Sequence, residues 1–162
     1  MNGVIKPAKT LVIAVIFGLT LASQCATAQV FPRGNGLSLA GLDQFDMYVQ
    51  IQQWEAMDGD EGSFRLETLQ KLENEFKSAG IRRRSAGRDY LVCNLQASRD
   101  GNRIAYNVSV EYWLLASTDV NKLMWQNSRM SLVSANRFDI DSVASECVGL
   151  FITEWQQWNP AT

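Results

Sequence analysis

The side chains able to perform acid–base or nucleophilic chemistry are few in this sequence of 162 residues. Histidine is absent, which removes the commonest general base and the usual partner of a serine or cysteine nucleophile. Carboxylates remain, and glycoside hydrolysis needs only two of them. Asp46 and Glu111 are the candidates for such a pair. A histidine-free carboxylate enzyme acting on a glycan is therefore one hypothesis, although no catalytic motif accompanies these acids.

A short acidic segment, residues 57–63, is the one candidate for a metal site. Asp58, Asp60 and Glu61 offer the oxygen ligands that Ca²⁺ prefers, but the twelve-residue spacing of a calcium loop and its final bidentate glutamate are absent. Acidic residues also stabilise the N-terminus of a following helix. The segment therefore predicts a turn before a helix, and the sequence predicts no metal and no other cofactor.

Four arginines form the only concentrated charge in the sequence, and they are Arg82, Arg83, Arg84 and Arg88. Such a cluster can bind phosphate, sulfate or an acidic segment through paired N–H donors. Runs of like charge more often face water, and a solvated connecting loop is the preferred interpretation.

The first 28 residues have the pattern of an export signal. Lys6 and Lys9 precede the uncharged, largely apolar run Leu11–Ala22, and Ala26–Ala28 has the small-x-small form that signal peptidase cuts. The apolar run is shorter than the about 20 helical residues needed to span a bilayer. The mature protein is expected to begin at Gln29, without a transmembrane span, and to be periplasmic or secreted.

Cys25 supports an alternative in which it becomes the acylated first residue of a lipoprotein. The preceding residue, Gln24, is not the small residue that lipoprotein processing usually requires. Soluble export is therefore favoured over lipidation. Removal of the signal leaves 13 basic and 17 acidic residues, a net charge of −4, which makes nucleic acid an unexpected partner.

Apolar periodicity predicts six elements. Strand alternation covers Phe45–Trp54, Tyr90–Ala97, Arg103–Leu115 and, less clearly, Leu123–Val133, whereas helical spacing covers Leu66–Ala79 and Val143–Trp158. Asp100 and Gly101 mark a tight hairpin between the second and third strands. Gly80 is expected to end the first helix in a left-handed conformation, and residues 139–142 offer caps for the last helix.

The resulting β-α-β-β-β-α order predicts a single α+β domain, residues 42–160, after a flexible leader, residues 29–41. Two helices on one face of a four-stranded sheet would bury both helical stripes and one face of every strand. Cys93 and Cys147 both point into this helix-covered layer. Either they form a disulfide, worth about 3 to 4 kcal/mol in the chain-entropy model, or they are two separate buried thiols.

The second sheet face, called the open sheet face below, should carry aromatic and amide side chains with few charges. This composition suits a recognition surface for a protein or a glycan, and the alternative is an ordinary open face or one partly covered by the leader. The strand alternation assigns to this face Tyr48, Gln50, Gln52, Trp54, Asn94, Gln96, Asn107, Ser109, Glu111 and Trp113, with Trp125, Asn127 and Arg129 from the fourth strand.

Two short signatures accompany this order of elements. Ala79, Gly80 and Ile81 end the first helix, and the last helix ends at Asn159 and Pro160. With them the sequence resembles small exported bacterial envelope proteins of unassigned function, over most of residues 42–160. Its topology is similar to that of the lipopolysaccharide-assembly lipoprotein that plugs an outer-membrane transporter, and less closely to the amino-terminal domain of the Tol-system protein TolB. The resemblance implies a non-catalytic assembly or accessory role in a bacterial envelope.

A non-catalytic binding or accessory protein is therefore the favoured function, with an envelope protein or glycan as its partner. The carboxylate enzyme is one alternative, and a homo-oligomeric structural component that pairs through strand edges is another.

Overall fold

The computed structural model describes residues 33–34, 36–54 and 59–160. The predicted signal peptide, Cys25, Asp58 and the side chain of Trp54 lie outside the described part of the chain. No described helix is long and apolar enough to cross a membrane.

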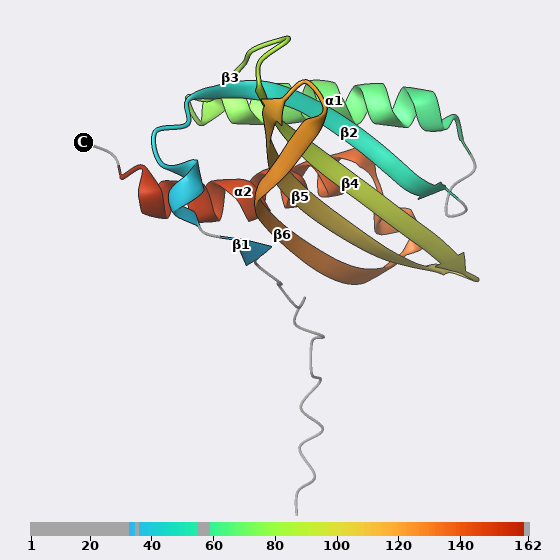
Figure 1. Cartoon of the computed structure of the whole chain (residues 1–162). Helices are drawn as coiled ribbons and strands as arrows, with labels where there is room; N and C mark the ends of the chain where they lie inside the picture. The colour runs from blue at the N-terminus through green and yellow to red at the C-terminus, as the bar shows by residue number, and fades with distance from the viewer. Residues whose placement is uncertain (1–32, 35, 55–58, 161–162) are drawn as a thin grey trace, which may run out of the picture.

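The described residues form one twisted, mixed sheet with two helices on one face (Figure 1). The strand order is β1-β6-β5-β4-β2-β3. Four strands are long, namely β2 (Gln44–Trp54), β4 (Asp89–Asp100), β5 (Arg103–Ser117) and β6 (Val120–Ser134). The short strands β1 (Arg33–Gly34) and β3 (Arg82–Arg83) lie at the two edges.

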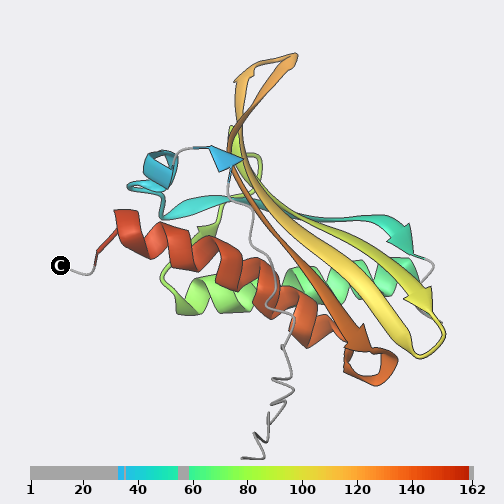
Figure 2. The same cartoon turned by 90° about the horizontal axis from the view of Figure 1, so that it is seen from below.

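The connections explain the mixed sheet. β2 pairs in parallel with β4, and helix α1 (Glu61–Ser78) connects them across one face, whereas β4, β5 and β6 pair antiparallel. Helix α2 (Ile140–Trp158) follows β6 through the short helix η2 (Ala135–Arg137) and returns to the same face, as Figure 2 shows. The predicted α+β class and element order are confirmed.

Both helices begin and end as their local sequence predicts. Asp60 caps α1 by accepting a hydrogen bond from the Ser63 amide at 2.7 Å, so the acidic turn acts as a helix start. Gly80 has a φ of +86°, and the Ile81 amide reaches back to the Phe76 carbonyl at 2.9 Å, which closes α1 in a Schellman arrangement. Asp139 and Ser142 form a capping box at the start of α2.

The core lies between the sheet and the two helices. Phe45 of β2 packs edge-to-face on Phe76 of α1 and Phe151 of α2, with ring centroids 5.7 and 5.3 Å apart. A disulfide joins Cys93 of β4 to Cys147 of α2, with the Cα atoms 6.0 Å apart. Of the two alternatives for these cysteines, the structure therefore has the bonded one, which ties α2 to the sheet.

The face predicted for β6 is wrong. Trp125 is 1% exposed and packs edge-to-face on Phe151, with ring centroids 5.8 Å apart. Trp125 pairs with Tyr112, and Asn127 pairs with Val110, so both lie on the helix-covered face together with Arg129. Burial of the indole against α2 decides the register, because both faces of β6 carry mixed residues. The open face of β6 instead carries Gln126, Ser128, Met130 and Leu132.

The segment predicted as a flexible leader packs against the core in its described part. Within the short helix η1 (Gly36–Leu39), Leu39 is fully buried. Asn159, just past α2, donates to the Leu39 carbonyl at 2.8 Å and accepts from the Gly41 amide at 2.6 Å. The Trp155 indole donates to the Leu42 carbonyl at 2.7 Å. The end of α2 therefore holds this segment in place.

Candidate functional site

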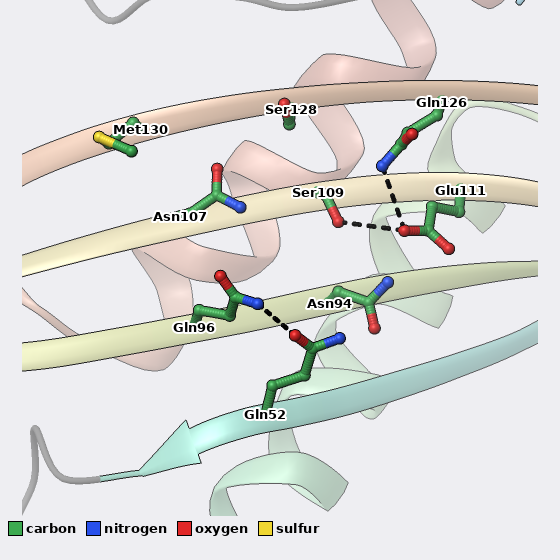
Figure 3. Close-up of a pocket in the computed structure, with 9 residues that line it drawn as sticks. All are labelled: Gln52, Asn94, Gln96, Asn107, Ser109, Glu111, Gln126, Ser128 and Met130. Carbon is green, nitrogen blue, oxygen red and sulfur yellow. Dashed lines mark hydrogen bonds between the residues drawn. The ribbon is translucent and has the colours of Figure 1, made fainter. Parts of the chain in front are cut away.

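The open sheet face contains a hollow with a volume of about 500 Å³ (Figure 3). Four strands line it, and all but two of the lining side chains are amides or hydroxyls. We call it the amide hollow, and its lining consists of Gln52, Asn94, Gln96, Asn107, Ser109, Glu111, Gln126, Ser128 and Met130.

Strand pairing aligns these side chains in rows that cross the strands. One row contains four uncharged polar residues, one from each long strand, because Gln50, Asn94, Ser109 and Ser128 are successive partners in the sheet. Side chains on one face of neighbouring strands lie close together. The hollow therefore presents a continuous polar floor across the sheet.

Some groups in the amide hollow already have partners. Gln96 donates to Gln52 through their side-chain amides. Glu111 accepts from the Trp113 indole at 2.9 Å, from Gln126 at 3.2 Å and from Ser109 at 3.4 Å. The one carboxylate among the described lining residues is therefore surrounded by hydrogen-bond donors.

Two other polar side chains of the amide hollow lack such partners. Asn94 is only 6% exposed, and its side-chain oxygen has no hydrogen-bond partner. Figure 3 shows Asn107 above the same floor with no bond to the other lining residues. An unpaired buried acceptor costs about 1 to 3 kcal/mol. The Asn94 oxygen is shielded from solvent, so its missing partner is a cost to the fold, whereas the partly exposed Asn107 side chain is accessible from the hollow.

A second polar group lies around Asp46, which is 4% exposed in β2. The carboxylate accepts from Arg83 at 2.9 Å, from the Tyr48 hydroxyl at 2.8 Å and from the amides of Met47 and Ala86 at 2.9 and 3.3 Å. Burial raises the pKa of Asp46, but the hydrogen bonds from Arg83, Tyr48 and the two amides outweigh it and hold the pKa below its usual value.

Asp46 and Glu111 are not arranged as a catalytic pair. Asp46 does not line the amide hollow, and its oxygens accept four hydrogen bonds. In the described residues, no group of three or more acidic, cysteine or histidine side chains is placed to bind a metal ion. The geometry therefore gives no support to the carboxylate-enzyme hypothesis.

The four arginines make contacts within the chain. Arg83 joins Asp46 and Glu73, and Arg84 forms an ion pair with Asp89. The Arg88 guanidinium donates to the Leu115 and Ala116 carbonyls at 3.0 and 2.9 Å. Arg82, with a side chain 71% exposed, lies 3.8 Å from Asp43. The cluster therefore connects β2, α1, β4 and β5, and its binding of an external anion stays an untested prediction.

The remaining predicted residues surround the hollow or lie within it. Gln52, Asn107 and Ser109 line it, whereas Gln50 lies in the same polar row. Tyr48 is 47% exposed, and its ring packs edge-to-face on Tyr90. Trp113 is next to the hollow through its bond to Glu111.

Sequence reasoning missed Gln126, Ser128 and Met130. The signal that would have found them is the two-residue turn Thr118–Asp119, because Ser117 and Val120 pair directly on either side of it. If residues are paired outward from this turn, Trp125 lies opposite Tyr112 and therefore on the helix-covered face. The next residue, Gln126, and every second residue after it then lie on the open sheet face.

Fold and hollow together define an α+β protein with two helices on one sheet face and a polar, hollowed surface on the other. No family model and no curated protein matches the sequence. Among solved structures, the PelC dodecamer from Paraburkholderia phytofirmans shares the fold with a TM-score of 0.51 at 13% identity, over 80% of this chain and 97% of that chain. A leucine-to-methionine variant of the same PelC dodecamer has a TM-score of 0.50 at 15% identity, and the match covers 80% of this chain and 98% of that chain.

Identities this low show a common fold and no family membership. The match supports the element order on which the resemblance to exported envelope proteins rests. The likeness to the lipopolysaccharide-assembly lipoprotein and to TolB stays a prediction.

Proposed function

We propose that this chain is a non-catalytic accessory or binding protein of the bacterial envelope and that the amide hollow binds its partner. The observation that carries the proposal is the amide hollow itself, a space of about 500 Å³ above an almost uncharged floor of amides and hydroxyls. Such side chains can both donate to and accept from a bound molecule. Export through the predicted signal of residues 1–28 forms part of the same proposal.

A glycan suits the amide hollow better than a protein segment does. The backbone groups of the floor are used in the sheet ladder, so the central strands cannot add an extended peptide as a further strand. Side-chain amides and hydroxyls remain, and these both donate and accept, as the hydroxyls of a sugar do. The lining has no cation and one carboxylate, which favours an uncharged ligand.

The test combines capture in cells with binding in solution. A photo-reactive residue is placed at Asn107 or at Ser128, with Leu66 on α1, which is 61% exposed, as the control position. We expect both hollow positions, and not Leu66, to capture a discrete envelope component. Capture from none of the three positions, or equally from Leu66, would contradict the proposal.

Titration of the mature protein with neutral, acidic and basic oligosaccharides then identifies the ligand class. We expect Asn107→Ala to abolish binding of a neutral oligosaccharide, whereas Asn74→Ala, at an exposed position on α1, leaves it unchanged. A captured protein together with no oligosaccharide binding would assign the hollow to a protein partner instead.

A homo-oligomeric structural component is the second candidate function. It is favoured by one observation, the shared fold with PelC, which forms dodecamers. Sedimentation velocity of the mature chain over a concentration series tests it, and a monomer at every concentration would exclude it.

A further inference from the structure

Among the described residues, most of the outer edge of β6 has no neighbouring strand. β1 pairs with β6 only at Trp125 and Gln126, and no described strand pairs with Ser128–Ser134 on that side. Natural edge strands usually carry a proline, lysines or a bulge that prevents further pairing. Ser128–Ser134 has no proline, lysine or bulge, since both irregularities of β6 pairing precede it, and its one charged residue, Arg129, lies on the helix-covered side. We call this segment the β6 edge.

The β6 edge also exposes apolar side chains. Met130 and Leu132 are 62% and 60% exposed, and both lie on the open sheet face. No other pair of large exposed apolar residues two positions apart occurs in the described part of the chain. Adjacent exposed apolar residues of this size favour contact with another surface.

The backbone direction of the β6 edge can be read from the hairpin. The Ala135 amide donates to the Asn102 carbonyl at 2.9 Å, so Ala135 points toward β5. Backbone groups alternate in direction along an antiparallel strand. Ser128, Met130, Leu132 and Ser134 therefore direct their N–H and C=O groups outward, away from β5.

The sequence of the β6 edge is nearly symmetric about Ser131. Serines stand three positions before and after it, and Met130 and Leu132 flank it. We infer that the β6 edge pairs with the β6 edge of a second copy of this chain, antiparallel, with Ser131 on the two-fold axis. Met130 then lies opposite the partner's Leu132, and Ser128 lies opposite the partner's Ser134.

This register satisfies both the backbone and the apolar side chains. The residues with outward-directed backbone groups face one another, so they form hydrogen-bonded pairs. Met130 and Leu132 make two equivalent apolar cross-strand pairs, as a two-fold contact requires. The two copies then share one continuous sheet.

Charge on the helix-covered side is complementary as well. Glu146 accepts from Tyr106 at 2.6 Å and from Ser131 at 3.3 Å, and its second oxygen is buried without a partner. The buried Nε of Arg129 also lacks a partner. These two side chains of opposite charge lie within one copy beside the β6 edge, and both act on Tyr106 of that copy.

The size of the contact predicts a weak dimer. Seven residues span about 24 Å at about 3.4 Å per residue. A single strand pair of this length buries less than the about 1,600 Å² of a standard interface, so we expect dissociation in the micromolar range or above. An isologous contact of this kind can also join copies within a larger assembly of dihedral symmetry.

The inference rests on the second candidate function, self-association, and two double variants test it. M130K/L132K places like charges opposite each other at both symmetric pairs, whereas M130K/L132E places opposite charges there. Both variants carry the same loss of apolar surface at exposed positions, so each is the matched control of the other. Circular dichroism checks that both retain the fold.

Sedimentation velocity of the mature chain and both variants provides the measurement. We expect the parent chain to dimerise, M130K/L132K to dissociate roughly tenfold or more readily than M130K/L132E, and high salt to reduce that difference. If the two variants dissociate equally readily, the proposed antiparallel β6 contact is wrong. If the parent assembles and neither variant changes its assembly, self-association stands and this contact is wrong.

A parent chain that stays monomeric at every concentration contradicts self-association itself. The proposed pairing of the β6 edge with a second copy would then be wrong as well.

Discussion

Two polar groups on the sheet differ in how their hydrogen bonds are distributed. Around Asp46, a buried carboxylate is matched by an arginine, a tyrosine hydroxyl and two backbone amides. In the amide hollow, the buried side-chain oxygen of Asn94 has no partner and the lining is almost uncharged. The charged group is complete within the chain, whereas the neutral group is not.

This difference separates a structural role from a binding role. A charge with all its partners inside the protein stabilises the fold and offers little to an external ligand. A neutral amide without a partner lowers stability. The almost uncharged hollow that contains it is the site at which we propose that a partner binds.

Removal of the Asp46 carboxylate should have the largest effect. We expect Asp46→Ala to lower the free energy of unfolding by about 3 kcal/mol, because it leaves Arg83 and two backbone amides without their acceptor. Urea denaturation measures the change. Asp43→Ala, which removes the exposed partner of Arg82 at 3.8 Å, is the control and should change stability by less than about 0.5 kcal/mol. Similar losses of stability in both variants would contradict the structural role assigned to the Asp46 carboxylate.

Acid titration should show a smaller effect of the same carboxylate. The folded-state pKa of Asp46 is lowered from its ordinary 3.8, so its stabilising effect is present above that value and is lost as the pH falls through the folded-state pKa. We expect the stability difference between the parent and Asp46→Asn to be constant above about pH 5 and to shrink below pH 3.8. A difference that grows on acidification would contradict this assignment.

Replacement of Asn94 should stabilise the protein, whereas replacement of Asp46 destabilises it. We expect Asn94→Leu to raise the free energy of unfolding by about 1 kcal/mol, because it removes a buried acceptor without a partner. Ser109 is its control, since it is 7% exposed and bonded to Glu111. Ser109→Ala should therefore be neutral or destabilising in thermal and urea unfolding. Destabilisation by Asn94→Leu would mean that the Asn94 side chain is satisfied in the folded protein.

The smallest change in stability is expected at Asn107. It is partly exposed and makes no bond to the other lining residues, so Asn107→Ala should alter the unfolding free energy by less than about 0.5 kcal/mol. The same variant should lose ligand binding, which calorimetry measures. If Asn107→Ala loses stability as well as binding, the Asn107 side chain has a structural role and does not mark an open binding group.

Much of the fold follows from local sequence. Alternation along residues 103–115 identifies the core face of β5, and Asp60, Gly80 and Asp139 mark helix ends through bonds that span at most five positions. Cys93 and Cys147 could be assigned to the same layer, but whether they bond depends on a Cα separation that sequence does not contain.

The predicted sheet face was correct for the described side chains of β2, β4 and β5 and wrong for β6, and whether that face binds a partner stays a prediction. Trp125 and Asn127 were assigned to the open sheet face because β6 lacks a clear alternation, and a shift of one residue moves every side chain to the opposite face. The described part of the predicted leader was also misjudged. Its glycines suggested a surface segment, whereas Asn159, more than 100 positions away, bonds to Leu39 and Gly41 and holds it on the core.

The sequence by itself determined the element order, the helix caps, the hairpin at Gly101 and the amide-rich character of one sheet face, because each depends on neighbours in the chain or on a period of two. Only the tertiary structure decided which polar groups are satisfied. Arg83 reaches Asp46 across 37 positions, and Asn94 lies beside side chains from three other strands without bonding to them. Hydrogen bonding between distant residues depends on register and packing, which the order of residue types does not specify.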